Sequence, residues 1–298
     1  MLAKHHNVAA QRGLPLSEPP ISPVDPQAPQ QREPMFNVPG VIIGVIAVLL
    51  LIYAGGLFLS DESQADLIKR FAFEPARLTY FFAPDTMRSV IAALGAQGGQ
   101  GANRAGLAQF LIGSGSLQPW TFLTYAFLHG SWVHVGSNSL WLLVFGAPVA
   151  RRFGTWRFLL LLAVTAIAGA LMHYAFNATS IAPVIGASAA VAGAMGAAVR
   201  FVFQPGGLSP QAGYVPPLTL GAVMRNTSAM TFLVVWFVVN LVTGVGSGAL
   251  AISSGPIAWQ AHIGGLLAGL LLFNLFDRHE PDAQQSLASA PEQAHPDT

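Results

Sequence analysis

The middle of this sequence contains no carboxylate side chain. All 13 acidic residues lie at or before Asp85 or at or after Asp277, so residues 86–276 carry none. A soluble domain needs acidic residues on its outer helix faces, whereas an ion at the centre of a bilayer costs several kcal/mol. The chain is 53% hydrophobic and only 9% charged, against about 25% charged residues in soluble domains. These features predict an integral membrane protein.

Six apolar segments divide the chain. Each is close to the roughly 20 residues that an α-helix needs to cross the hydrocarbon core of a membrane. The segments lie at about 39–59, 131–149, 157–176, 183–203, 229–250 and 258–276. We therefore expect an all-α integral membrane protein, a bundle of six transmembrane helices with both termini on the same side.

The regions around these segments differ in composition. Residues 1–38 and 278–298 are polar and proline-rich, and we expect them to be disordered arms on either side of a membrane domain at 39–277. The first outer loop, at about 60–130, contains the apolar stretch AQFLIGSGSLQPWTFLTYAFLH, which Gly and Pro interrupt. We expect this stretch to be partly embedded in the membrane rather than a seventh span. The run LGAQGGQGANRAG in the same loop is typical of a flexible linker.

Positive charge assigns the two sides of the membrane. If the N-terminus is cytoplasmic, most of the 14 Lys and Arg residues fall in the inner segments, and the short outer loops near 177–182 and 251–257 carry none. Because Lys and Arg in short loops favour the cytoplasm, both termini are predicted to be cytoplasmic. The absence of cysteine and the short outer loops fit a bacterial inner membrane.

Composition also argues against several classes of function. The formal net charge is +1 and no basic run is present, so nucleic acid is not an expected partner. Without cysteine, the chain has no disulfide, thiol nucleophile or cysteine metal site. We expect neither a metal ion nor another cofactor.

Polar side chains within the apolar segments are costly, and four of them stand out. His134 and Asn138 share one face of the second span, because they are four residues apart. Ser188 lies near the start of the fourth span and His262 near the start of the sixth. With a cytoplasmic N-terminus, these three spans all run from outside to inside. The four side chains are therefore expected at a similar shallow depth on the outer side.

This set of groups suits peptide hydrolysis by a serine–histidine dyad. Peptide hydrolysis needs a nucleophile, a base and donors for the developing oxyanion. Ser188 is the predicted nucleophile and His262 the predicted base. No carboxylate is available to form a triad with them. The backbone N–H of Ser188 and the side chains of Asn138 and His134 are the predicted oxyanion donors. His129 and His173 are interpreted as forming hydrogen bonds near the membrane interface.

At these residues the chain resembles the rhomboid family of intramembrane serine proteases. The similar segments are QPWTFLTYAFLHGSWVHVGSN, the turn at Arg152-Phe153-Gly154, VIGASAAVAGAMGA around the serine, and AHIGGLLAG around the histidine. The resemblance implies a six-helix bundle with a cavity open to the outside and a first loop partly packed into the outer leaflet. It also implies cleavage of single-pass or other transmembrane proteins within the bilayer, with the fifth helix as a substrate gate.

Three positions depart from the family pattern. Ala189 follows the serine where the family usually has Gly, Ala192 stands where some members have an aromatic ring, and Ala150 replaces an acidic residue. None of these changes removes a predicted catalytic group. The alternatives are a catalytically weak or inactive rhomboid-like protein that binds transmembrane segments in membrane protein quality control, and a small-solute transporter. No inverted repeat supports the transporter.

Overall fold

The computed structural model describes residues 38–208, 214–246 and 257–277. The predicted terminal arms lie outside these residues, apart from Val38. Every regular element within the described ranges is a helix, and the only strand-like pairing there is an isolated bridge between Phe73 and Val184. The predicted all-α fold is confirmed.

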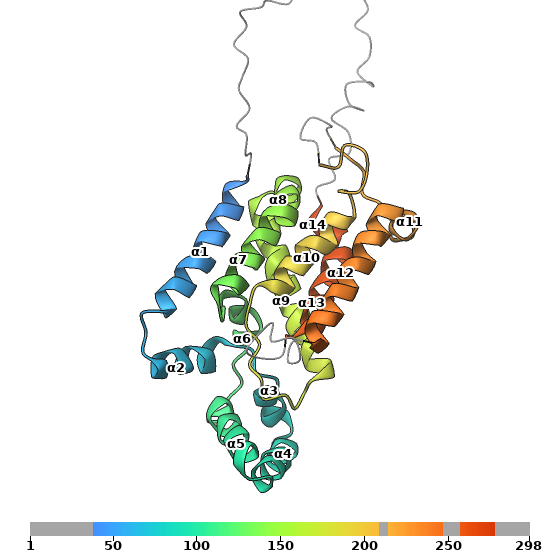
Figure 1. The fold of residues 1–298 in the computed structure, drawn as a ribbon. Helices are drawn as coiled ribbons and strands as arrows, with labels where there is room; N and C mark the ends of the chain where they lie inside the picture. Colours follow the sequence, from blue (N-terminus) through green and yellow to red (C-terminus); the bar gives the residue numbers. More distant parts are fainter. Residues whose placement is uncertain (1–37, 209–213, 247–256, 278–298) are drawn as a thin grey trace, which may run out of the picture. The chain divides into compact units, whose positions relative to one another are not determined.

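The bundle consists of helices that follow the predicted apolar segments (Figure 1). Ser131 begins the second of these stretches by accepting a hydrogen bond from the backbone N–H of His134, as serine does at many helix N-termini. Gly154, with a φ of 76°, ends that stretch and separates it from the next helix. The elements are α1 (Gly40–Gly56), α7 (Trp132–Trp141), the π-helical turn η2 (Leu142–Gly146), α8 (Ala147–Phe153), α9 (Thr155–Phe176), α10 (Ser188–Val199), α11 (Leu220–Arg225), α12 (Thr227–Gly246), α13 (Trp259–Leu271) and α14 (Phe273–Phe276).

Within the described residues, three helical stretches are long and apolar enough to cross a membrane. They are Trp132–Phe153, Thr155–Phe176 and Thr227–Val245. Helices α1 and α10 are apolar but shorter, and the last apolar segment is divided between α13 and α14. The molecule is a membrane bundle, and six as the number of spans remains a prediction.

Helix α10 is the core of the bundle, because all of its residues from Ala189 to Val199 are buried. Glycines let α10 and α13 approach closely. A Cβ atom on Gly265 would lie 2.0 Å from the carbonyl oxygen of Ala189, and one on Gly269 would lie 1.9 Å from that of Gly193. The two helices therefore run parallel with backbone against backbone, as small residues four positions apart permit.

The long first loop is mostly helical. Its elements are α2 (Asp61–Phe71), α3 (Pro75–Phe82), α4 (Pro84–Ala96), α5 (Gly99–Ile112), α6 (Thr121–Thr124) and the 3-10 turn η1 (Tyr125–Phe127). Helices α4 and α5 form a hairpin at the end of the bundle opposite α8 and α11 (Figure 1). Partial insertion of this loop into the membrane remains a prediction.

The glycine-rich run in this loop is not a flexible linker, and that prediction was wrong. Gly98 and Gly99 have φ values of 64° and 47°, which turn the chain between α4 and α5. A Cβ atom on Gly101 would lie only 2.4 Å from the carbonyl oxygen of Leu94. The glycines therefore permit a tight helical turn, because side chains at these positions would be strained or would clash.

The first loop is attached to the segment that precedes α10. Phe73 and Val184 exchange two backbone hydrogen bonds, of 3.1 and 2.8 Å, and the N–H of Ala76 donates to the carbonyl of Ser180 at 3.0 Å. The guanidinium of Arg77 donates to the carbonyls of Lys69 and Leu111. The loop thus supports the chain just before Ser188.

Charged groups are paired at the opposite end of the bundle. The guanidinium of Arg152 donates to both carboxylate oxygens of Asp277, at 2.7 and 2.8 Å, and to the carbonyl of Val215. Arg200 donates to the carbonyls of Leu218 and Leu270. A buried ion pair is stable only when its groups are hydrogen-bonded in this way. Asp277, the first acidic residue after the acid-free stretch, thus joins the end of α14 to α8.

Glu74 is a buried acid in the first loop. Among the described residues, neither of its carboxylate oxygens has a hydrogen-bond partner. Burial raises the pKa of Glu74 to about 8, although the charge of Arg77 acts in the opposite direction. The folded protein therefore keeps this proton between its ordinary pKa of 4.5 and about 8, whereas the unfolded chain loses it.

We expect the stability of the protein to fall with rising pH in this window because of Glu74. Relative to Glu74→Gln, the free energy of unfolding of the wild type should decrease by up to about 1.4 kcal/mol per pH unit. Thermal unfolding of both proteins in detergent at pH 5 and pH 8 measures the difference. Glu62→Gln, at an exposed position of α2, is the control. A Glu74→Gln effect that is equal at both pH values would contradict the prediction.

Candidate active site

Ser188 and His262 are in direct contact. Ser188 is the first residue of α10, and His262 lies in the first turn of α13. The Oγ atom of Ser188 lies 2.7 Å from Nε2 of His262. This distance is possible because α10 and α13 pack so closely, with the backbone of Gly265 against that of Ala189. A hydroxyl and an imidazole at this distance can exchange a proton.

His134 and Asn138 border the turn that leads into Ser188. Gly186 has a φ of 115°, a conformation that glycine adopts most readily. A Cβ atom there would lie 2.5 Å from Nε2 of His134 and 3.7 Å from Nδ2 of Asn138. Both side chains come from the first two turns of α7. The structure therefore brings all four predicted site residues to the ends at which α7, α10 and α13 begin.

His129 belongs to this cluster, although its place in the sequence predicted only hydrogen bonds near the membrane interface. Its Nε2 atom lies 3.0 Å from Nδ2 of Asn138 and accepts from the backbone N–H of Ala187 at 3.4 Å. Burial lowers the pKa of His129 to about 4, and the nearby His134 adds to the shift. A neutral imidazole has one acceptor nitrogen with a single lone pair, which the two N–H groups share here. His129 thereby holds the Asn138 amide beside the turn. Its closeness in sequence to His134 and Asn138 was the available signal, but spacing does not place it beside them, because it lies outside α7.

Asn240 of α12 is a second residue of the cluster that is absent from the predicted site. Its Oδ1 atom lies 2.6 Å from Nδ1 of His262, and its Nδ2 atom donates to the carbonyl of Trp259 at 3.1 Å. The side chain is buried. An amide within an apolar span was the signal, because buried polar groups in membranes need partners.

The methyl group of Ala189 packs toward α9. It would lie 2.5 Å from a Cβ atom on Gly169, so the glycine leaves room for it. Ala189 is itself buried, and its carbonyl faces Gly265 of α13. The departure from the usual family residue is thus matched by a small residue on the neighbouring helix.

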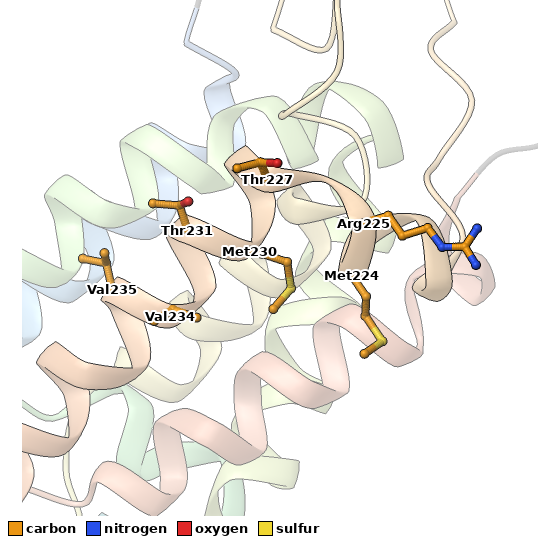
Figure 2. Close-up of a pocket in the computed structure, with 7 residues that line it drawn as sticks. All are labelled: Met224, Arg225, Thr227, Met230, Thr231, Val234 and Val235. Carbon is orange, nitrogen blue, oxygen red and sulfur yellow. The ribbon is translucent and has the colours of Figure 1, made fainter.

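Two hollows adjoin α12, and neither is lined by the Ser188–His262 pair. One, of about 430 Å³, lies at the junction of α11 and α12, where Met224, Met230 and Val234 line it (Figure 2). The other, of about 590 Å³, lies between α12 and Trp141 of α7, with Phe232 and Trp236 in its apolar lining. The second hollow marks a gap between the second and fifth predicted spans.

A family model decides the classification of the chain. The model of the rhomboid domain matches residues 116–278, which is more than half of the sequence. The protein belongs to the rhomboid family. The matched region contains α6 through α14 and every residue of the site, whereas α1 to α5 precede it.

Curated relatives carry the name rhomboid protease GlpG. The protein of Serratia proteamaculans is 29% identical over 169 residues, which cover 57% of this chain and 52% of the relative. The protein of Yersinia enterocolitica is 30% identical over 174 residues, covering 58% and 54%, and that of Yersinia pestis strain Pestoides F is 30% identical over 156 residues, covering 52% and 48%. The chain spans about half the length of these relatives.

Proposed function

We propose that this rhomboid protein is an intramembrane serine endopeptidase, with Ser188 as nucleophile and His262 as base. The observation that carries the proposal is the 2.7 Å contact between Ser188 Oγ and His262 Nε2 inside a membrane bundle. The names of the relatives support the same reaction class. A hydroxyl bonded to an unprotonated imidazole nitrogen is the arrangement that activates a serine nucleophile.

The proposed reaction has two halves. Ser188 Oγ attacks the carbonyl carbon of the substrate peptide while its proton passes to Nε2 of His262. The tetrahedral intermediate then collapses, the C–N bond breaks, and His262 returns the proton to the leaving amine. In the second half, a water molecule gives a proton to His262 and attacks the acyl carbon. The bond between that carbon and Ser188 Oγ then breaks, His262 returns the proton to Oγ, and the new carboxyl end is released.

The oxyanion of each intermediate needs hydrogen-bond donors. The first N–H groups of a helix have no partner within the helix, so the N–H of Ser188 suits this role. Asn138 keeps one amide proton for the oxyanion when the other is donated to His129, and His134 lies on the same side of the Gly186 turn. These three groups form the proposed oxyanion hole.

The proposed substrates are transmembrane segments of single-pass or other membrane proteins. Only 17% of the apolar window of α12 is buried, against 56% for Trp132–Phe153 and 44% for Thr155–Phe176. A loosely packed helix beside the hollow at Trp141 offers a lateral path from lipid toward the site. Helix α12 is therefore the proposed substrate gate.

The proposed orientation has the site on the outer side of a bacterial inner membrane and both termini in the cytoplasm. Arg151, Arg152 and Arg157 lie around the junction of α8 and α9, and Arg200 and Arg225 lie at the ends of α10 and α11. Ser188 and His262 lie where α10 and α13 begin, at the other side of the bundle from these arginines. These five charges thus lie away from the site, whereas the basic residues of the long first loop lie on its side. The positive-inside rule counts charges in short loops, so it supports the proposed orientation.

Covalent labelling tests the proposed nucleophile. We expect a fluorophosphonate probe to label the purified wild-type protein in detergent and to leave Ser188→Ala unlabelled, as measured by in-gel fluorescence. Ser139→Ala, which removes a buried hydroxyl of α7 that bonds to the carbonyl of Val135, is the matched control and should label normally. Equal labelling of wild type and Ser188→Ala would overturn Ser188 as the nucleophile. No labelling of either protein would favour the alternative, a rhomboid-like protein that binds transmembrane segments without cleaving them.

A further inference from the structure

Asn240 is a buried polar residue in a helix that otherwise faces outward. Of the α12 residues whose side chains the structure describes, only Ala229 and Asn240 are buried. An unpaired amide in an apolar setting costs free energy, so its position requires specific partners. Both of its partners lie in the first turn of α13, and one of them, His262, is a member of the dyad.

The hydrogen bonds of Asn240 determine which nitrogen of His262 carries the proton. The carbonyl of Trp259 can only accept, so the group that faces it is the NH₂ of the Asn240 amide. The amide oxygen therefore faces Nδ1 of His262, at 2.6 Å. An amide oxygen can only accept, so Nδ1 is the protonated nitrogen. In a neutral imidazole, this leaves the lone pair on Nε2, which faces Ser188 Oγ.

We propose that Asn240 is a positioning residue of the active site, which holds His262 in the tautomer that can accept the proton of Ser188. This inference rests on the proposed function and adds a third member to the dyad. A neutral amide can do this in a region without carboxylates, where an ionised acid would be costly to bury. The bond from Nδ1 persists when His262 is protonated, so the partial negative charge of the amide oxygen also stabilises the imidazolium.

A purely structural role makes different predictions. Asparagine often joins transmembrane helices by hydrogen bonds, and its loss then lowers stability without changing the chemistry. Loss of a positioning residue frees the imidazole to rotate and to adopt the other tautomer. The rate of the serine reaction then falls, and its pH dependence responds to the group that replaces the amide.

The rate constant for fluorophosphonate labelling, measured from pH 5 to pH 9, separates the two roles. Asn240→Leu should lower the rate constant on the order of ten- to a hundredfold, less than the loss of the charged member of a serine protease triad. Asn240→Asp should retain more of the rate and move the acidic limb of its pH profile upward by about one unit, because a carboxylate favours the imidazolium. Thr243→Val removes a hydroxyl of α12 that bonds only to backbone carbonyls, and it should match the wild type.

Each outcome decides something different. An unchanged labelling rate in Asn240→Leu, with labelling still dependent on Ser188, would overturn the role of Asn240 and leave the proposed function intact. If Asn240→Leu does not fold, Asn240→Asp decides alone: a wild-type pH profile would overturn the inference. Labelling that does not depend on Ser188 would overturn the proposed function and, with it, the inference.

Discussion

Replacement of His262 with alanine is expected to lower the rate of peptide cleavage by about 10⁴- to 10⁶-fold. Members of a serine protease site act as one unit, so the loss of the base alone removes most of the catalysis. His262 is the imidazole in contact with Ser188 Oγ. The contact that proton transfer requires is therefore already formed. Ser188→Ala should show a loss of similar size, and the double variant should be little worse than either single one.

The measurement is cleavage of a fluorescently tagged single-pass membrane protein by purified enzyme in liposomes. His173→Ala is the matched control, because His173 is a buried histidine of the neighbouring helix α9 and bonds to Asn177. It should retain activity, and all variants should keep the elution volume and helical circular dichroism of the wild type. Losses in Ser188→Ala and His262→Ala that add up in the double variant would contradict a joint role of the two residues.

The contact between Ser188 and His262 was accessible from the sequence. Polar side chains are rare in apolar spans, so the few that occur carry much of the information. Alternate spans cross the membrane in the same direction, so the second, fourth and sixth spans all begin on the same side of the membrane. A small-residue stripe, Ala261, Gly265 and Gly269, indicates which face of the last span packs closely. These arguments bring the two residues near each other without knowledge of the loops.

The lengths of the helices could not be read from hydropathy. The segment 183–203 is apolar apart from Ser188 and Arg200, yet α10 begins only at Ser188. The chain before it is extended, pairs with Phe73 of the first loop, and turns at Gly186 with a positive φ. An average over apolar residues does not detect a backbone that uses its hydrogen bonds elsewhere. The same limit explains why the glycine-rich run of the first loop was mistaken for a linker.

Asn240 was missed for a different reason. Its partners, His262 and the carbonyl of Trp259, belong to a different helix, and sequence spacing within one span does not reveal pairs between spans. The rule that intramembrane polar groups need partners applied to it as well as to Asn138. A fuller use of that rule would have identified Asn240 as a candidate, but its particular role depends on distances that only the structure provides.

The second large effect is expected at the contact between α10 and α13. Gly269→Ala should prevent the bundle from packing, because the new Cβ atom would lie 1.9 Å from the carbonyl oxygen of Gly193. Overpacking commonly costs about 1–3 kcal/mol, and here the obstacle is the backbone of the central helix rather than a flexible side chain. We expect a loss at or beyond the upper end of that range, measured as the free energy of unfolding in mixed micelles.

Gly136→Ala is the matched control for this loss. It makes the same chemical change in α7, where no atom beyond the adjacent backbone of that helix lies within 4 Å of the new Cβ. Alanine is the better helix former by about 1 kcal/mol, so this variant should be as stable as the wild type or slightly more stable. The stabilising term is the same at Gly269, so the difference between the two variants isolates the helix contact. Equal stability of the two variants would show that α10 and α13 do not pack backbone against backbone, and the short distance between Ser188 and His262 would then lose its structural basis.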